Sequence, residues 1–121
     1  RCEGMGQVSD IDLAQLYDCF TPTVLIELED LGFCPKGEAG RFVADGHIGP
    51  GGSLPVNTHG GLLSHCHPGN PGSMFALTEA VMQLRHAAGA RQVPGATTAM
   101  VHAQGGIMSS HTTIILGREC K

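Results

Sequence analysis

Runs of apolar and polar residues along the chain predict two helices set among short strands. The first helix is predicted between Thr21, a residue type favoured at helix N-caps, and Gly32, which suits a helix end. Pro22 fits the first helical turn. The apolar positions of this segment recur at helical spacing, at Val24, Leu25, Leu28 and Leu31. We therefore expect one apolar face that packs on a core.

A second helix is predicted within residues 70–89. Its apolar residues also recur at three- and four-residue steps, at Met74, Leu77, Val81 and Leu84. Gly89 is expected to end this helix. The apolar stripe is interpreted as core packing and not as a lipid groove.

Four further segments carry strand signals. A short buried strand is predicted at Leu13–Tyr17 and another at Ser53–Asn57. Residues 96–103 and 111–117 are rich in β-formers and are expected to pair in antiparallel fashion. Phe33–Gly52 is interpreted as a loop. The order β-α-β-α-β-β predicts a layered α/β fold.

Length, charge and cysteine content narrow the class of protein. A chain of 121 residues is one domain at most. A net charge of −4 without a basic stripe argues against nucleic-acid binding. No apolar run approaches the ~18 residues of a membrane span, and no signal-peptide pattern opens the chain. Five cysteines without paired spacing favour reduced thiols, and hence a cytoplasmic protein.

The segment NTHGGLLSHCHPGNPG gathers three histidines and a cysteine. Because His65, Cys66 and His67 are adjacent, they do not easily converge on one tetrahedral ion, and no metal site is expected. His67 precedes a predicted helix N-terminus, where a neutral imidazole is favoured and can accept a proton. The alternative for His67 is a loop histidine without a role.

Cys19 lies in the segment YDCF, where a predicted strand ends and a predicted helix begins. This junction is a common place for catalytic groups in α/β layers, and a helix N-terminus favours the thiolate. The alternative is a small buried thiol with a packing role.

Four segments together resemble the C-terminal half of a thiolase, most closely the sterol-carrier (lipid-transfer) branch with its acetyl-CoA acetyltransferase-like chemistry. They are YDCFTPTVLIELEDLGFCPKGEAGRFV, GGSLPVNTHGGLLSHCHPGNPG, EAVMQLRHAAGARQVPGA and VHAQGG, in the family's order. The resemblance implies a single partial domain over residues 1–121. It also implies that the fold lacks its central strand, which would lie between the pair 13–17/53–57 and the pair 97–104/110–116. Such a chain is expected to need a partner chain or self-association.

The resemblance also implies roles for individual residues. His67 occupies the position of the histidine that activates the nucleophilic cysteine and contacts the thioester oxygen, although the glycine that usually precedes it is Cys66 here. Cys19 matches the acid/base cysteine of the sterol-carrier branch. Tyr17 replaces the usual Asn or His of an oxyanion hole, and related steroid-side-chain aldolases also carry a tyrosine there. His102 stands where other thiolases have the cysteine of a CxG motif. The residues expected to bind or position substrate are Asn57, Gly60, Gly61, Gly69, His102, Gly105 and Gly106.

The function implied is that of the C-terminal part of an acyl-CoA thiolase or acyltransferase, with coenzyme A as substrate and no resident cofactor. The nucleophilic cysteine of this chemistry belongs to the N-terminal half of the family fold, so the chain alone is expected to be inactive. One alternative is a non-catalytic assembly module that pairs with itself, as a homo-oligomer, or with a thiolase-like or OB-fold protein. The other alternative is an aldolase-type lyase that acts on an acyl-CoA, as suggested by Tyr17.

Overall fold

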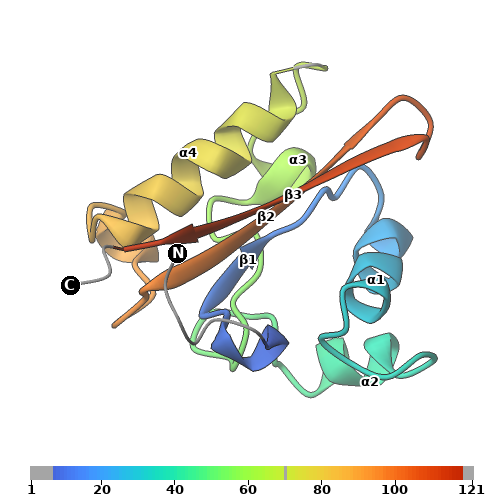
Figure 1. Cartoon of the computed structure of the whole chain (residues 1–121), viewed down its shortest axis with the longest axis horizontal. Helices are drawn as coiled ribbons and strands as arrows, with labels where there is room; N and C mark the ends of the chain where they lie inside the picture. Colours follow the sequence, from blue (N-terminus) through green and yellow to red (C-terminus); the bar gives the residue numbers. More distant parts are fainter. Residues whose placement is uncertain (1–6, 70, 119–121) are drawn as a thin grey trace.

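The structure is a computed structural model that describes residues 7–69 and 71–118. A three-stranded sheet forms its middle layer, with strand order β1-β2-β3. The strands are β1 (Leu13–Gln15), β2 (Thr98–Gly105) and β3 (Ser110–Gly117). β1 runs parallel to β2, and β2 pairs antiparallel with β3, which confirms the predicted hairpin (Figure 1).

Helices cover both faces of this sheet. The helices are α1 (Thr21–Asp30), α2 (Ala39–Ala44), α3 (Gly61–Ser64) and α4 (Gly72–Leu84), and two 3-10 turns lie at Val8–Asp10 and Gly89–Arg91. α4 lies on one side of the sheet, and α1 and α2 lie on the other (Figure 1). Among the described residues, no helix has both the length and the apolar character to cross a membrane. The predicted α/β layering is confirmed.

Side chains of β1 and β2 alternate between two apolar clusters. Leu13 and Val101 pack with Ala80 and Leu84 of α4. Ala14, Leu16 and Met100 pack with Leu28 of α1 and with Leu54. The alternation follows from the two-residue period of a strand that is covered on both faces. The end of β1 is thus fixed between α1 and α4, and the YDCF segment begins there.

Among the described residues, the strands expected to flank the missing central strand pair directly, so the unpaired inner edges expected from its absence are not present. β1 pairs directly with β2, with Leu13 opposite Ala99. Asp12 reinforces the contact because its Oδ2 accepts hydrogen bonds from the backbone N–H groups of Thr97 and Thr98, at 2.8 and 2.9 Å. The backbone N–H and C=O groups on the facing edges of β1 and β2 therefore form hydrogen bonds with one another.

The segments around β1 also differ from the prediction. The strand expected at Ser53–Asn57 is reduced to one bridge between Ala14 and Val56. β1 stops at Gln15, short of the predicted Tyr17, because the Leu16 N–H turns to the Asn57 side chain. The stretch predicted as a loop contains α2, whose Ala39 is buried in the core.

α1 and α4 end with the same backbone geometry, but a glycine takes the left-handed conformation in one and a histidine in the other. At the end of α1, Gly32 has φ +83°, and the Phe33 N–H donates to the Leu28 carbonyl. At the end of α4, His86 takes the left-handed conformation with φ +55°, and the Ala87 N–H donates to the Met82 carbonyl. Both are Schellman caps. α4 therefore ends before Gly89, where the sequence predicted its end.

Candidate active site

Two of the predicted catalytic residues meet in the structure. Tyr17 follows β1, and His67 follows α3, fifty residues later in the sequence. Their ring centroids lie 6.1 Å apart, with an interplanar angle of 78°. Tyr17 is half-buried, whereas His67 is exposed. An exposed imidazole therefore lies edge-on beside a half-buried phenol.

Asp18 joins the two segments that carry these rings. Its Oδ1 accepts a 2.7 Å hydrogen bond from the Leu62 N–H, and its Oδ2 accepts one of 3.4 Å from the Leu63 N–H. These two amides belong to the first turn of α3, where no helical carbonyl can reach them. A Cβ at Gly61 would lie 2.1 Å from Asp18 Oδ2, and Gly61 has φ +64°. Gly61 is thus required for the close approach of this buried carboxylate.

Glu27 lies behind the Tyr17 turn and was not singled out from the sequence. It is 4% exposed, and its Oε2 accepts a 3.1 Å hydrogen bond from the Tyr17 N–H. Its Oε1 accepts a short hydrogen bond from Gln104 Nε2, on β2. Burial raises the pKa of Glu27 to about 7, against the hydrogen bonds from Gln104 and Tyr17, and the Asp18 charge adds to the increase.

A narrow crevice beside Tyr17 collects groups from both motif segments and from β2. Tyr17, Asp18, His59, Gly61 and His102 contribute to its lining. His59 is half-buried, and its Nδ1 has no hydrogen-bond partner among the described residues. Burial is the main cause of the lowered pKa of His59. The structure thus adds His59 to the candidate site.

His102 is hydrogen-bonded on both ring nitrogens. Its Nδ1 lies 2.8 Å from Thr113 Oγ1, and its Nε2 lies 3.3 Å from His111 Nδ1. His111 Nε2 donates to the Met108 carbonyl at 3.3 Å, so in the neutral pair His111 Nδ1 accepts from His102. Burial, followed by the neighbouring His111, lowers the pKa of His102. Burial and the neighbouring His111 thus favour the neutral form of His102 at the crevice.

Cys19 lies at the N-terminal end of α1 and is half-exposed. Its Sγ is 3.6 Å from Thr23 Oγ1, a hydroxyl one helical turn away. Its recorded contact is thus with α1 itself and not with the rings of Tyr17 and His67. The acid/base role predicted for Cys19 stays a prediction.

Asn57 holds the backbone that leads into the second motif segment. It has φ +50°, and its Oδ1 accepts a 2.8 Å hydrogen bond from the Leu16 N–H. Its own N–H donates to the Ala14 carbonyl at 3.0 Å. In the structure Asn57 aligns the segment before Gly60 with the end of β1. Whether it also contacts substrate stays a prediction.

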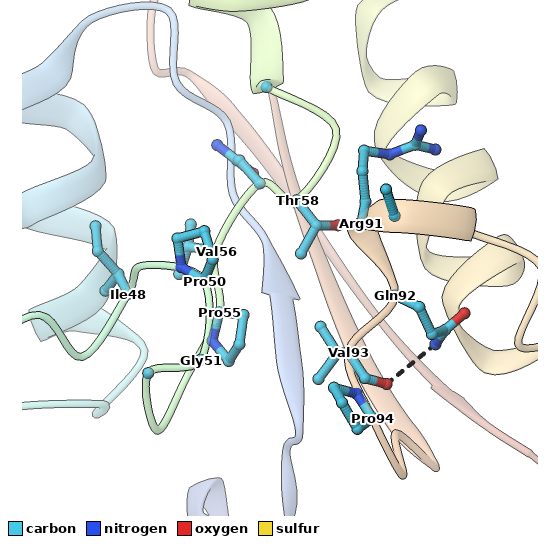
Figure 2. Close-up of a pocket in the computed structure, with 14 residues that line it drawn as sticks. Ile48, Pro50, Gly51, Pro55, Val56, Thr58, Arg91, Gln92, Val93 and Pro94 are labelled. Carbon is cyan, nitrogen blue, oxygen red and sulfur yellow. Dashed lines mark hydrogen bonds between the residues drawn. The ribbon is translucent and has the colours of Figure 1, made fainter.

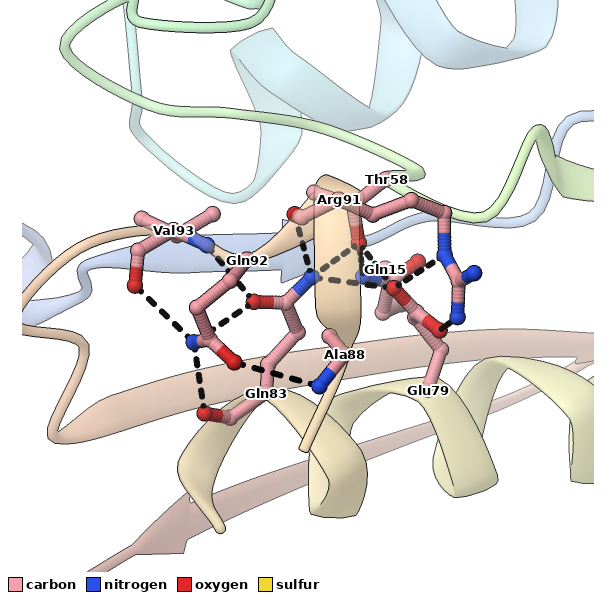
Figure 3. Close-up of polar contacts among 8 residues, drawn as sticks. All are labelled: Gln15, Thr58, Glu79, Gln83, Ala88, Arg91, Gln92 and Val93. Atoms are coloured by element: carbon pink, nitrogen blue, oxygen red, sulfur yellow. Dashed lines mark hydrogen bonds and ion pairs between the residues drawn. The ribbon is translucent and has the colours of Figure 1, made fainter. Parts of the chain in front are cut away.

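Thr58, the next residue, is the centre of a buried polar network (Figure 3). It accepts from Gln15 Nε2 at 3.1 Å and donates to Glu79 Oε1 at 2.7 Å. Arg91 forms an ion pair with Glu79, with Nη2 and Oε2 2.9 Å apart. Burial raises the pKa of Glu79, but hydrogen bonds from Arg91, Gln83 and Thr58 outweigh it and lower the pKa overall. This network fixes the Asn57–His59 turn on α4.

A cavity of about 650 Å³ lies beside the same turn (Figure 2). Its lining includes Asn57, Thr58 and Gly60 from one segment of the chain and Arg91 and Val93 from another. Proline and valine side chains make its walls largely apolar. Of the predicted substrate-binding residues, only Asn57 and Gly60 line this cavity.

The remaining predicted glycines lie away from the crevice lining. Gly69 is exposed with φ +74°, and Gly105 pairs with Ser110 at the end of the β2–β3 hairpin. Gly106 follows with φ +66°, as the turn requires. Their predicted roles in substrate binding stay untested.

The histidine- and cysteine-rich segment does not gather ligands for a metal. In the part of the chain that the structure describes, no group of three or more His, Cys, Asp or Glu side chains could hold a metal ion. Cys19, Cys34 and Cys66 are free thiols, while Cys2 and Cys120 lie outside the described residues.

A comparison with protein-family models gives one match that covers nearly the whole chain. Residues 3–118 match the model described as thiolase C-terminal domain-like. The chain belongs to this family. The resemblance stated from the four motif segments is thereby confirmed.

Relatives of this thiolase-like chain include both transferases and lyases. It is 42% identical over 109 residues to an acetyl-CoA acetyltransferase of Methanothermobacter thermautotrophicus, covering 90% of the chain and 28% of the relative. It is 46% identical over 109 residues to a 17-hydroxy-3-oxo-4-pregnene-20-carboxyl-CoA lyase of Mycobacterium tuberculosis, covering 90% of the chain and 27% of the relative. It is 44% identical over 94 residues to sterol carrier protein 2 of Bos taurus, covering 78% of the chain and 17% of the relative.

A solved structure, an Ltp2-ChsH2(DUF35) aldolase, has the same fold. The TM-score is 0.82 at 41% identity, and the match covers 93% of this chain and 28% of the other. The partial thiolase fold is thus confirmed. The thiolase-like chain spans between 17% and 28% of the length of these related proteins.

Proposed function

We propose that this thiolase-like chain supplies the histidine and acid/base side of an acyl-CoA site in which a carbon–carbon bond beside the thioester is broken or formed. The observation that carries the proposal is the 6.1 Å edge contact between the rings of Tyr17 and His67. The rings come from two motif segments that Asp18 ties together. A thioester oxygen placed between them would meet a phenol O–H and an imidazole, the two donors that a developing enolate oxygen needs.

Thiolytic acyl transfer is the leading form of this chemistry. The bond between Cα and the 3-oxo carbon of a 3-oxoacyl-CoA breaks, and the acyl group passes to a cysteine supplied by the rest of the protein. The electron pair stays on Cα as a thioester enolate. Cys19 gives its proton to Cα, coenzyme A then takes the acyl group from the cysteine, and the proton of the coenzyme A thiol passes back to Cys19. His67 accepts and returns the proton of the attacking thiol.

A retro-aldol cleavage is the second candidate, favoured by Tyr17 and by the relatives described as a lyase and an aldolase. Here a base removes the proton of a 3-hydroxyl group, and the Cα–Cβ bond breaks. A carbonyl compound leaves, and the enolate takes a proton at Cα. No covalent cysteine is required, so the groups around Tyr17 would carry the reaction.

Both candidates are tested in a protein that joins this chain to a thiolase-like N-terminal half. The assays are thiolysis of acetoacetyl-CoA by coenzyme A, and release of a carbonyl compound from a 3-hydroxyacyl-CoA. His67→Ala is expected to lower kcat about 100-fold or more, as for loss of general acid/base catalysis. Tyr17→Phe should abolish most lyase activity and reduce thiolysis less. Absence of both activities in the unaltered protein would overturn the proposal.

A matched control for these variants is His47→Ala. His47 stacks on Phe42 of α2, with ring centroids 4.4 Å apart, and it does not line the crevice. The variant should retain the activity of the unaltered protein. The 121-residue chain alone should give no exchange between coenzyme A and acetoacetyl-CoA, and measurable exchange would contradict the need for an N-terminal half.

A relative of the same fold suggests that this chain acts together with a partner protein. The solved relative is described as an Ltp2-ChsH2(DUF35) aldolase, a title that joins two protein names. By analogy, we propose that this chain functions within an assembly, with a second copy or with an OB-fold protein. Sedimentation of the purified chain tests this, since a well-folded monomer would argue against an obligatory partner.

A further inference from the structure

Glu27 is a buried acid that the proposed reaction does not use. It lies in the middle of α1 and is 4% exposed, yet both of its oxygens accept hydrogen bonds from other elements. One donor is the backbone N–H of Tyr17, and the other is the side-chain amide of Gln104. Glu27 and Gln104 are 77 residues apart in sequence. A single carboxyl group thus connects the YDCF turn with the segment VHAQGG.

The two segments that Glu27 connects both contribute to the crevice. Tyr17 and Asp18 come from the first segment, and His102 comes from the second. Glu27 does not line the crevice, so it acts on the site through the backbone of Tyr17 and through β2. A carboxylate accepts both hydrogen bonds at once, whereas a carboxylic acid must place its own proton on one of the two oxygens.

We propose that Glu27 is a positioning residue whose ionised carboxylate clamps the Tyr17 turn to the end of β2, so that the site is competent only after Glu27 has lost its proton. The catalytic consequence rests on the proposed function, but the clamp itself does not. Protonation of Glu27 makes one of its oxygens a weaker acceptor and so loosens its hydrogen bond from either Tyr17 or Gln104.

The surroundings of Glu27 explain why it can switch near neutral pH. Burial and the charge of Asp18 oppose ionisation, and the hydrogen bonds from Gln104 and Tyr17 favour it. Asp18 is itself fixed by the Leu62 and Leu63 amides, so its charge stays close to the turn. Gln104 on β2 is uncharged. The resulting pKa of about 7 falls within the range that a cell can explore.

The clamp is tested on the 121-residue chain by nuclear magnetic resonance between pH 5 and pH 9. The Tyr17 amide and the Gln104 side-chain amide should shift together with one midpoint near pH 7. Glu27→Gln should remove this shared transition, since the amide keeps the shape of the side chain but cannot ionise. Glu38→Gln, at an exposed position before α2, is the matched control and should leave it unchanged. Independent midpoints, or a transition that persists in Glu27→Gln, would overturn the proposal.

The effect on the site is tested in the protein that joins this chain to an N-terminal half. In the unaltered protein kcat should rise about tenfold between pH 6 and pH 8. In Glu27→Gln this rise of kcat with pH, the pH limb, should disappear, while KM changes less than twofold. Gln104→Ala should weaken the limb in the same direction. If the protein turns over no acyl-CoA, the proposed function fails while the resonance experiment still decides the clamp. If activity is present but the pH limb survives in Glu27→Gln, the clamp fails alone.

Discussion

The carboxylate of Asp18 accepts a 2.7 Å hydrogen bond from the backbone N–H of Leu62, 44 residues later in the chain. Leu62 belongs to the first turn of α3, a helix too short to be stable without outside support. The carboxylate supplies an acceptor that the sequence of α3 does not, because its N-cap residue is Gly60. The positions of Tyr17 and His67 therefore both depend on Asp18.

Asp18→Ala should lower the free energy of unfolding by about 1–3 kcal/mol, because it leaves two α3 amides, one of them buried, without an acceptor. Asp18→Asn keeps one acceptor oxygen and should cost less. Chemical denaturation measures both. Asp45→Ala removes only an exposed partner of Arg41 and should change stability by less than about 0.5 kcal/mol. Equal losses at Asp18 and Asp45 would contradict the assignment.

His86→Gly should raise the free energy of unfolding by roughly 0.5–1 kcal/mol. His86 ends α4 in the left-handed conformation, which glycine adopts without the Cβ clash that other residues suffer. Thermal unfolding should show a higher Tm. His86→Ala keeps a Cβ at the same position and should give no gain, so a gain in both variants would mean that the backbone conformation is not the cause.

The parts of the fold that were predicted from sequence are those with local signals. α1 carries start and stop signals at Thr21, Pro22 and Gly32, although its N-cap residue is Phe20 and Thr21, predicted as the N-cap, is its first helical residue. The end of α4 was placed too late because the residue that stops it is a histidine, which seldom takes that conformation. α3 was missed because its support comes from Asp18, far away in sequence.

The candidate site was also predicted where its residues have local sequence signals, and it was missed where distant contacts create it. Tyr17 and His67 lie in recognisable motifs, and the structure brings them together. Glu27 escaped notice because it is one of several acidic residues on a helix, and only the distant Gln104 and the fold of β2 bury it. The resemblance implied a missing central strand, but it did not show that the flanking strands would close on one another, because strand pairing is decided by backbone contacts such as the Asp12 N–H to Thr98 carbonyl hydrogen bond.

Arg91→Met should lower the free energy of unfolding by about 2 kcal/mol at pH 7, because it leaves the Glu79 carboxylate buried without its cation. The folded-state pKa of Glu79 is lowered, so its contribution is present above its ordinary pKa of 4.5 and is lost as the pH falls through the folded value. The loss caused by Arg91→Met should therefore shrink below pH 4.5.

A double-mutant cycle checks this assignment. Glu79→Gln combined with Arg91→Met should be more stable than the sum of the two single losses predicts. The exposed pair of Arg41 and Asp45 serves as control, with a coupling near zero. Additive losses for Glu79 and Arg91 would show that the ion pair does not contribute to stability.

Glu27 should make the protein less stable as the pH rises from 4.5 to about 7. Its folded-state pKa is raised from 4.5 to about 7, so the native state binds more protons than the unfolded state in this window. The contribution of Glu27 to the free energy of unfolding is largest below pH 4.5. It falls between pH 4.5 and about 7 and does not change further at higher pH.

The difference in free energy of unfolding between the unaltered chain and Glu27→Gln should therefore fall by about 3 kcal/mol from pH 4.5 to pH 8, as measured by urea denaturation. Subtraction of the Gln variant removes the contributions of His59 and His102, whose pKa values are lowered and which act in the opposite direction. A difference that rises with pH would mean that the hydrogen bonds from Tyr17 and Gln104 outweigh burial. The predicted sign implies that burial disfavours the ionised form of Glu27, although this is the form that we propose holds the two crevice segments together. Such a conflict between stability and a local arrangement is expected at a functional site and has no use in a purely structural one.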